Sequence, residues 1–489
     1  MIHSSTPTAH QTSIAHPTRR NFLDFSVSGL QSAALMTLLN SDTGRASEAG
    51  RSRAVFRTIP ARAKRVIHIC LVGGYSQVDS FDYKPKLDAL HNRSIPGNGR
   101  PDTFFGSAGL LCKSHWTFRQ RGESGLWISD LFPHLAAVAD QLTIINSMVS
   151  DTANHTPATF QQLTGFQANG FPSLGSWLSY GLGNESDALP TFIVLPDARS
   201  LPSGGAANWS NGFLPAEHQG TLFHGGRDPI RELFAAERIP AAAERDARRL
   251  LQQINRKHAD QRASNDVLQA RIRSYELAAR MQTSVPEAVD FSDETAATQQ
   301  MYGLGQAHTD DCARRCLLSR RLVERGVRFV QIFSGGAFGG QPRHGWDSHE
   351  NCRADHAREA RMIDQPISAL IQDLHQRGML DDTLVVFTTE FGRTPFAHAP
   401  AGVMALGRDH NPEGFTTWLA GSGLKAGCAY GHTDDIGWKA VENPVTWPDL
   451  HATLLHLLGI DHERLTFYHN GIERRLTNVH GQPIWPILT

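Results

Sequence analysis

Residues 384–395 read LVVFTTEFGRTP, an apolar run followed by a polar ending. The first six residues are β-branched, aromatic or leucine, a composition typical of a buried strand. Glu390, Gly392 and Arg393 follow at once. A carboxylate, a glycine and an arginine just beyond a buried strand are typical of the ligand site at the edge of an open α/β sheet. The stretch therefore predicts a core strand and a functional site where that strand ends.

Two polar clusters flank this strand in the sequence, at residues 343–349 (RHGWDSH) and 407–412 (GRDHNP). Asp347 and His349 are two residues apart, so an extended segment places both side chains on one side. The second cluster contains an adjacent Asp-His pair, which would face opposite ways on a strand, and we take His410 as its ligand. Carboxylate oxygen and imidazole nitrogen together suit Zn²⁺, Mn²⁺ or iron better than Mg²⁺ alone. The clusters predict a metal site, although either pair alone is also typical of surface or capping residues.

A first buried strand is predicted at residues 65–72 (RVIHICLV), with Asp79 shortly after its end. Asp79 and Glu390 are thus carboxylates just beyond two strands, and we predict that they hold a second metal ion. Two cations a few ångströms apart can clamp the attacking and leaving oxygens of a phosphate or sulfate ester. They can also generate hydroxide near neutral pH.

Groups that could bind an anion accompany these carboxylates. Arg393 is predicted to hold non-bridging ester oxygens by bidentate contacts, with Arg343 and Arg408 as further candidates. The alternative for each arginine is a structural salt bridge. A second strand at residues 142–148 leads into a helix for which Thr156 is the predicted N-cap, with a proline directly after it. The N–H groups at such a helix start can bind an anion.

Strands and helices alternate along most of the chain. Residues 196–300 differ, with a Gly/Ser/Asn-rich loop and then an Arg/Glu/Ala/Gln-rich helical stretch at 228–281. We interpret this segment as a helical insertion, because sustained heptads are missing. The pattern predicts an α/β fold, with a mostly parallel sheet sandwiched by helices, in one domain over residues 55–489. Further strands are predicted at residues 191–195, 327–333 and 415–420, and helices at 131–139, 308–325, 355–377 and 449–458.

The N-terminal residues 1–50 have the pattern of an export signal and linker. Arg19 and Arg20 precede a Phe-Leu pair, a modest apolar run at residues 27–39 and a tail rich in Ala, Ser and Gly. Twin arginines in this context predict recognition by the twin-arginine export machinery and a periplasmic or secreted protein. The alternative is an amphipathic helix with two surface arginines. The apolar run is too short and too polar for a stable membrane span.

Composition limits the function classes. The chain has 489 residues, of which 40% are hydrophobic and 19% are charged, and this fits a globular protein. Its formal net charge of −1 gives no electrostatic case for binding nucleic acid or an anionic membrane. Its 24 histidines are more informative, since imidazole ligates metals. The six cysteines include no Cys-x-x-Cys pair, and their disulfide pairing stays open.

The motifs GGYSQVDSFD, NHTPATFQQLTG, GWDSHEN, TTEFGRTP, GRDHNPEG and DLHATLLHLLGI occur in this order along the chain. Together they resemble the exported bacterial family called domain of unknown function 1501, within the alkaline phosphatase and sulfatase superfamily. The resemblance implies that Asp79 is the first-strand metal carboxylate, and that Asp347 and His349 form the pair of one metal site. It also implies that Glu390 stands where the superfamily has an Asp-His pair, and His410 where it has its late histidine ligand.

The sequence departs from the superfamily at the nucleophile. His155 stands in that position, the motif arginine is absent, and no formylglycine can form there. Three options follow: Thr156 as nucleophile, His155 as ligand or nucleophile, or a metal hydroxide that attacks directly. Phe391 also replaces a superfamily histidine, which leaves the second metal with one ligand fewer.

The resemblance implies a hydrolase of sulfate or phosphate esters that uses divalent metal ions (Zn, Mn, Ca or Mg). Its substrate would be an anionic small molecule or a polysaccharide ester. The alternative is a non-catalytic member of the fold that binds sulfated polysaccharide or a partner protein at the cell surface. A third interpretation, phosphoryl transfer within a substrate, lacks a clear nucleophile in this sequence.

Overall fold

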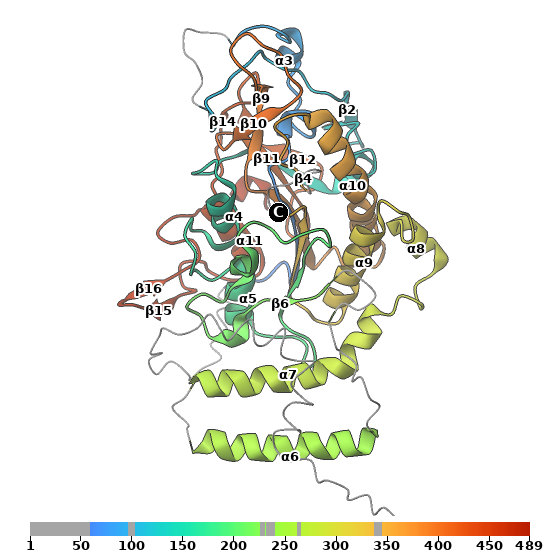
Figure 1. The fold of residues 1–489 in the computed structure, drawn as a ribbon, viewed down its shortest axis with the longest axis vertical. Helices are drawn as coiled ribbons and strands as arrows, with labels where there is room; N and C mark the ends of the chain where they lie inside the picture. Colours follow the sequence, from blue (N-terminus) through green and yellow to red (C-terminus); the bar gives the residue numbers. More distant parts are fainter. Residues whose placement is uncertain (1–58, 96–102, 225–229, 231–239, 262–265, 337–344) are drawn as a thin grey trace, which may run out of the picture.

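A central eight-stranded sheet organises the chain in the computed structural model (Figure 1). The structure describes residues 59–95, 103–224, 230, 240–261, 266–336 and 345–489. The strands of this sheet are β1 (Arg65–Leu71), β4 (Leu142–Met148), β5 (Phe192–Leu195), β6 (Thr221–Leu222), β7 (Phe329–Ser334), β8 (Thr383–Thr389), β11 (Phe415–Gly421) and β12 (Cys428–Tyr430). Their order across the sheet is β12-β4-β11-β8-β1-β7-β5-β6.

Strand β8, which contains the apolar run of residues 384–389, lies at the centre of the sheet beside β1. Strand β1 runs parallel to both β7 and β8, and β5 runs parallel to β6 and β7. Strand β4 is parallel to β12, whereas β11 is antiparallel to both of its neighbours, β4 and β8. The predicted mostly parallel sheet is therefore confirmed, and β11 is its antiparallel strand.

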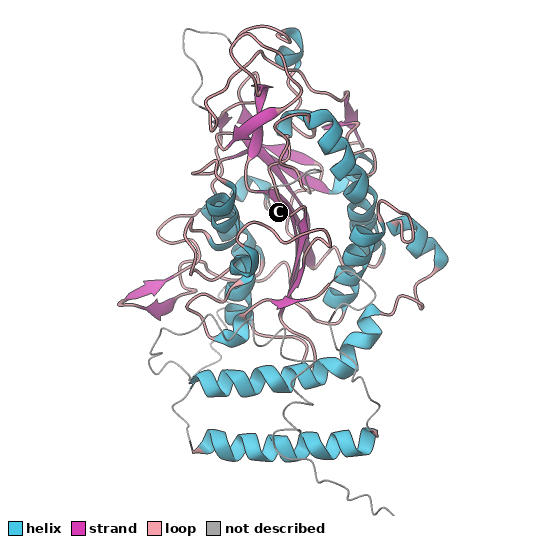
Figure 2. Ribbon diagram, viewed as in Figure 1, coloured by secondary structure: helices cyan, strands magenta, loops and turns pink. Residues whose placement is uncertain are grey.

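Helices cover both faces of the sheet (Figures 1 and 2). Along β1, Ile67, Ile69 and Leu71 pack into one apolar core, and Val66 and Cys70 pack into the other. A strand buried on both faces needs apolar residues at nearly every position, and this explains the continuous apolar runs in the sequence. Helices α9 (Asp310–Glu324) and α10 (Cys352–Gln376) contribute to the first core, while α5 (Leu174–Leu182) and α11 (Trp447–Leu457) contribute to the second.

The remaining elements are short or lie outside this sandwich. In Figure 1, α6 lies apart from the sheet, whereas β6, from the same predicted insertion, extends the sheet at its edge. The C-terminal part of α7 joins the first core through Met281, Val285 and Ala288. The division of the chain into an insertion and a main domain stays a prediction. The other elements are η1 (Gln77–Asp79), α3 (Pro85–Ala89), β2 (Phe118–Arg121), β3 (Leu126–Ser129), η2 (Leu135–Gln141), α4 (His155–Thr164), η3 (Gly205–Trp209), η4 (Ala216–His218), α6 (Ala241–Asp260), α7 (Asp266–Val289), α8 (Ala296–Tyr302), β9 (Gly392–Ala397), β10 (Arg408–Asn411), β13 (His432–Thr433), β14 (Ala440–Glu442), β15 (Phe467–His469), β16 (Ile472–Arg474) and η5 (Trp485–Ile487).

Some local predictions differ from the structure. The helix predicted at residues 131–139 is the 3-10 helix η2, which starts four residues later. Helix α4 starts at His155 with Asn154 as its N-cap, so Thr156 lies inside the first turn. Strands β9 (Gly392–Ala397) and β10 (Arg408–Asn411), which pair in antiparallel, lie where no strand was predicted.

The predicted export signal lies outside the described residues, so export stays a prediction. None of the helices in the described ranges is long and apolar enough to cross a membrane. All six cysteines lie in the described part of the chain, and none of them forms a disulfide there.

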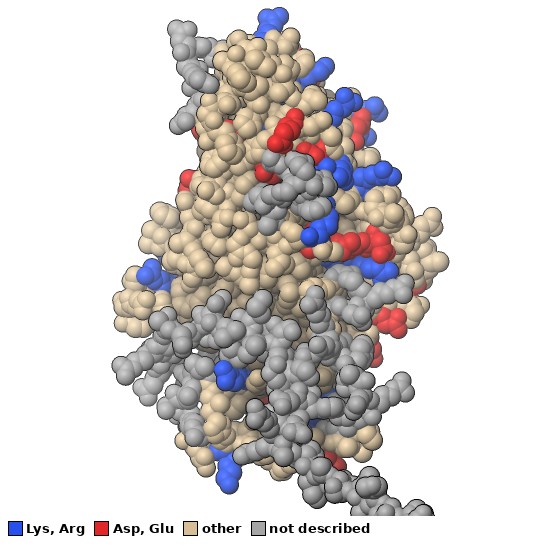
Figure 3. Space-filling view, in the orientation of Figure 1, with Lys and Arg blue, Asp and Glu red and all other residues tan. Residues whose placement is uncertain are grey.

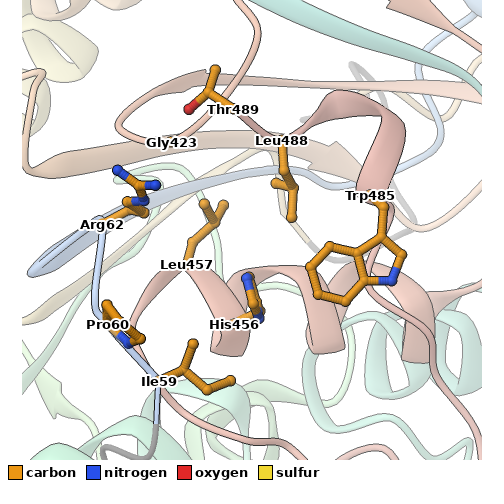
Figure 4. A pocket seen from close by; sticks show the side chains of 9 residues that line it. All are labelled: Ile59, Pro60, Arg62, Gly423, His456, Leu457, Trp485, Leu488 and Thr489. Atoms are coloured by element: carbon orange, nitrogen blue, oxygen red, sulfur yellow. The ribbon is translucent and has the colours of Figure 1, made fainter.

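One pocket lies where the chain enters β1 (Figure 4). Its volume is about 280 Å³. The ring centroids of His456 and Trp485 are 4.8 Å apart. The residues that line the pocket include no aspartate or glutamate. On the face shown in Figure 3, acidic and basic side chains are intermixed on the side where Figure 1 places α9 and α10. The pocket in Figure 4 is lined by Ile59, Pro60, Arg62, Gly423, His456, Leu457, Trp485, Leu488 and Thr489.

Candidate metal centre

A cluster of histidines and one aspartate gathers beyond the carboxyl ends of β1 and β8, the edge at which the sequence predicts a site. His155 is the first residue of α4, and His410 lies on β10. Asp347 and His349 come from the loop that precedes α10. Segments far apart in the sequence thus supply one cluster, because parallel strands bring their carboxyl ends to one edge.

Asp347 Oδ1 lies at the centre of this cluster. It is 2.8 Å from His349 Nε2, 3.3 Å from His410 Nε2 and 3.5 Å from His155 Nε2. His349 Nε2 and His410 Nε2 are 3.0 Å apart. His155, Asp347 and His410 are buried, and their ligand atoms lie within 4.8 Å of one another. Three imidazole nitrogens and a carboxylate oxygen form a donor set that suits Zn²⁺ and similar ions.

The hydrogen bonds of His410 determine which of its nitrogens can bind a cation. Its Nδ1 lies 2.7 Å from the carbonyl oxygen of Ala153, which can only accept, so Nδ1 carries the proton. Burial lowers the pKa of His410 well below its usual value, so the ring is neutral. Nε2 therefore presents a lone pair towards Asp347 Oδ1 at 3.3 Å. Two lone pairs that face each other in a buried site are stabilised when a cation lies between them.

Glu390 orients His155. Its Oε1 lies 2.8 Å from His155 Nδ1 and accepts a hydrogen bond of 2.8 Å from the backbone N–H of Gly73. This arrangement matches the carboxylate–histidine–metal pattern, in which the carboxylate fixes the tautomer and the free nitrogen binds the ion. Burial lowers the pKa of His155, but the hydrogen bonds that its ring donates to Asp347 and Glu390 outweigh this effect and raise the pKa overall. Metal binding would therefore displace a proton from this ring.

Arg393 holds Asp347 rather than facing solvent. Its side chain is fully buried and donates to Asp347 Oδ1 at 2.7 Å and to the carbonyl of Gly74 at 2.7 Å. It also donates to the carbonyls of Gly73 and Arg408. Burial opposes ionisation of Asp347, but Arg393 and the histidines hold the pKa of Asp347 well below its usual range. The predicted role of Arg393 as an ester clamp is corrected, because the side chain is fully buried and each of its three nitrogens already donates to a group within the protein.

Asp79 is not part of the cluster. It is fully buried and pairs with Arg408 Nε at 2.8 Å, and it also accepts from Ser76 Oγ at 2.6 Å and from the His115 N–H at 2.9 Å. Burial opposes ionisation, but Arg408 lowers the pKa of Asp79. Asp79 thus neutralises a buried arginine. The predicted second metal at Asp79 and Glu390 is corrected accordingly, as is the clamp role of Arg408. Arg343 lies outside the described residues.

Thr156, one of the predicted options for the nucleophile, forms a hydrogen bond away from the cluster. Its Oγ1 lies 2.5 Å from Ser203 Oγ, a residue of the loop that precedes η3. The structure brings His155, Asp347, His349, Glu390, His410 and Arg393 together, and pairs Thr156 with Ser203 instead. A covalent route through Thr156 has no support in these contacts.

Two further residues could bind metal: His398, for which no prediction was made, and Asp409, which was set aside in favour of its neighbour His410. His349, His398 and Asp409 form a second group whose ligand atoms lie within 4.8 Å of one another. His398 follows β9 directly, and its backbone N–H donates to the carbonyl of Gly407 at 2.9 Å. A β-hairpin prediction for residues 392–411 would have brought His398 close to the strand that carries Asp409.

Phenylalanine rings enclose the cluster. Phe391 is fully buried, and its ring centroid lies 4.5 Å from that of His410 and 4.9 Å from that of His155. On the outer side, the ring of Phe104 lies 4.9 Å from that of His410, and the ring of Phe105 lies 5.0 Å from that of His349. Phe104 and Phe105 are 44% and 55% exposed, so they form the solvent-facing edge of the cluster. An apolar shell of this kind limits water access and holds the imidazole rings in place.

Fold and cluster together define an α/β protein with buried groups of histidine and aspartate that could hold a metal ion. The chain belongs to the family described as "Protein of unknown function (DUF1501)", whose model matches residues 63–488. The predicted family is therefore confirmed. A comparison with curated proteins finds no match.

Similar solved structures include three hydrolases. A phosphonate monoester hydrolase from Silicibacter pomeroyi is 13% identical, with 73% of this chain and 71% of that chain covered and a TM-score of 0.34. A sulfatase from Pseudoalteromonas sp. is 14% identical, with 91% and 73% covered and a TM-score of 0.35. An alkaline phosphatase from the Antarctic bacterium TAB5 is 11% identical, with 77% and 96% covered and a TM-score of 0.34. At these identities and TM-scores the likeness says nothing about the activity of this chain.

Replacing Glu390 with glutamine should weaken metal binding without abolishing it. The amide cannot match the charge that fixes His155 Nδ1–H, so affinity should fall by about 10–100-fold. Competition with a chromogenic chelator measures this. Glu413→Gln is the control, because Glu413 is 42% exposed and pairs with Lys439 at 2.7 Å. Equal affinities in the two variants would contradict the orienting role of Glu390.

Proposed function

We propose that the protein is an exported, metal-dependent hydrolase of sulfate or phosphate esters. The observation that carries this proposal is the lone pair of His410 Nε2 directed at Asp347 Oδ1 across 3.3 Å of buried space. His155, Asp347, His349 and His410 would hold a divalent ion. Such an ion supplies a Lewis acid and lowers the pKa of bound water towards neutrality.

The protein's own groups would position this centre. Arg393 fixes the carboxylate of Asp347, and Glu390 fixes the ring of His155. The start of α4 lies beside the cluster, because its first residue is His155, and a helix N-terminus favours the negative charge of a sulfate or phosphate group. With His155 as a ligand and Thr156 bonded to Ser203, we favour direct attack by water over a covalent intermediate.

A test of this proposal uses the purified protein and a panel of aryl sulfates, aryl phosphates and phosphonate monoesters. We expect saturable turnover of at least one ester, its loss after treatment with a chelator, and its return on addition of Zn²⁺ or Mn²⁺. Absence of turnover by metal-loaded protein across the panel would contradict the proposal.

A second candidate, binding of sulfated polysaccharide without turnover, is favoured by the exposed Phe104 and Phe105 at the edge of the cluster. Exposed aromatic rings can pack against the apolar face of a sugar. A glycan array distinguishes the two, since this candidate predicts retention of sulfated glycans together with inactivity on every ester.

A further inference from the structure

His349 stands between the two groups of ligand atoms. Its Nε2 faces the first group, at 2.8 Å from Asp347 Oδ1 and 3.0 Å from His410 Nε2. Its Nδ1 faces the other way, at 3.0 Å from His398 Nδ1. A neutral imidazole carries a single proton, so it can donate from only one nitrogen at a time. Each nitrogen of His349 nevertheless lies against another ring nitrogen.

The second group contains an oriented carboxylate. Asp409 is fully buried, and one of its oxygens accepts from the backbone N–H of His410 at 2.8 Å while the other accepts from the N–H of Phe105 at 3.0 Å. Each oxygen has a further lone pair for a cation. On β10, Asp409 and His410 are neighbours that belong to different groups, as expected when successive side chains of a strand point opposite ways.

The ring of Phe105 covers this second group. It stacks on His398 at a centroid distance of 5.5 Å and an interplanar angle of 22°, and meets His349 edge-on at 5.0 Å. The backbone of the same residue bonds to Asp409. One residue therefore contacts all three members of the group and partly shields them from water.

We propose that His349, His398 and Asp409 form a second transition-metal site, and that the imidazole of His349 bridges it to the first. Two imidazoles and a carboxylate suit Zn²⁺, Cu²⁺ or Mn²⁺. On binding of the second ion, the His349 ring releases its remaining N–H proton to solvent, and each nitrogen then forms one bond to an ion. This inference rests on the metal centre proposed above.

The bridge sets the spacing of the two ions. Each would lie about 2 Å beyond one of the two nitrogens of a single ring, whose lone pairs point away from each other. That separation exceeds the about 3.5–4 Å of a two-metal clamp on one ester. The second ion therefore supports the first through His349 and is not a second clamp on the reacting oxygens.

The test measures metal stoichiometry by titrating the metal-free full-length protein with Zn²⁺ and, separately, with Cu²⁺. We expect two equivalents in the unaltered protein and one in His398→Ala and in Asp409→Asn. With two Cu²⁺ bound, coupling through the shared ring should weaken the electron paramagnetic resonance signal, and both variants should regain the signal of an isolated ion. His375→Ala is the control, since this exposed histidine of α10 lies outside both groups.

The outcomes separate the two proposals. A single equivalent that Asp347→Asn removes would overturn the second site and leave the first intact. No bound metal at all would overturn both. Two equivalents retained in His398→Ala and in Asp409→Asn would overturn the bridged site even if the protein is active.

Discussion

The substitution Asp347→Asn is expected to remove both metal binding and ester turnover. Asp347 Oδ1 contacts His155, His349 and His410, so it is the one oxygen shared by every histidine of the first group. Asparagine keeps the shape but loses the charge that a divalent ion requires. The loss should exceed the about 10–100-fold that removal of an orienting partner causes.

Metal content and turnover are measured on the same folded preparation of this variant. Asp355→Asn is the matched control, because Asp355 lies in the same region and accepts from Ser348 Oγ at 2.6 Å, yet belongs to neither metal group. Near-normal activity in Asp347→Asn would contradict the proposed centre.

The substitution Asp79→Asn is expected to destabilise the fold strongly while leaving metal binding intact in the folded protein. Arg408 and Asp79 are both fully buried and lie 2.8 Å apart. Removing one partner of a buried ion pair leaves the other charge uncompensated, at a cost of about 3–5 kcal/mol. Chemical denaturation measures this difference. Asp382→Asn is the control, since its pairs with Lys64 and Arg65 are partly exposed and should contribute about 1 kcal/mol or less.

The loss of folding stability caused by Asp79→Asn should depend on pH. The fold lowers the pKa of Asp79, so its contribution to stability is present above its unfolded pKa of about 3.9. That contribution is lost as the pH falls from there towards the folded pKa. The unaltered protein should therefore lose its advantage over the variant below about pH 4. A deficit that is constant from pH 7 to about pH 3 would contradict an ionised buried pair.

The apolar strands were predictable because burial on both faces leaves a local signature. Strand β4 spans Leu142–Met148 as predicted. Strand β8 begins one residue before the predicted start, and β11 ends one residue after the predicted end. Strands β9 and β10 were not predicted, because they contain Arg393, Arg408 and Asn411, which are polar yet fully buried. Propensity and periodicity contain no information about polar side chains that are satisfied by distant partners.

Distant partners also decide the roles of the carboxylates near the site, so these roles could not be predicted from the sequence. Asp79 and Glu390 follow strands in the same way, but one pairs with Arg408, which is 329 residues away, and the other with His155 at a separation of 235. Only the three-dimensional arrangement separates an ion-pair carboxylate from one that orients a histidine. Asp347, His349 and His410 were recognisable because their residue types suit metal wherever they meet. His398 lacked such a signal, since the strand that positions it was not predicted.

The central claim is that a metal ion occupies the space between His155, Asp347 and His410. Diffraction from crystals grown with Zn²⁺, recorded above and below the zinc absorption edge, tests it most directly. We expect an anomalous peak within about 2.0–2.2 Å of Asp347 Oδ1 and of the Nε2 atoms of His155 and His410. Ordered side chains with no peak between them, or a zinc ion bound only elsewhere on the protein, would contradict it.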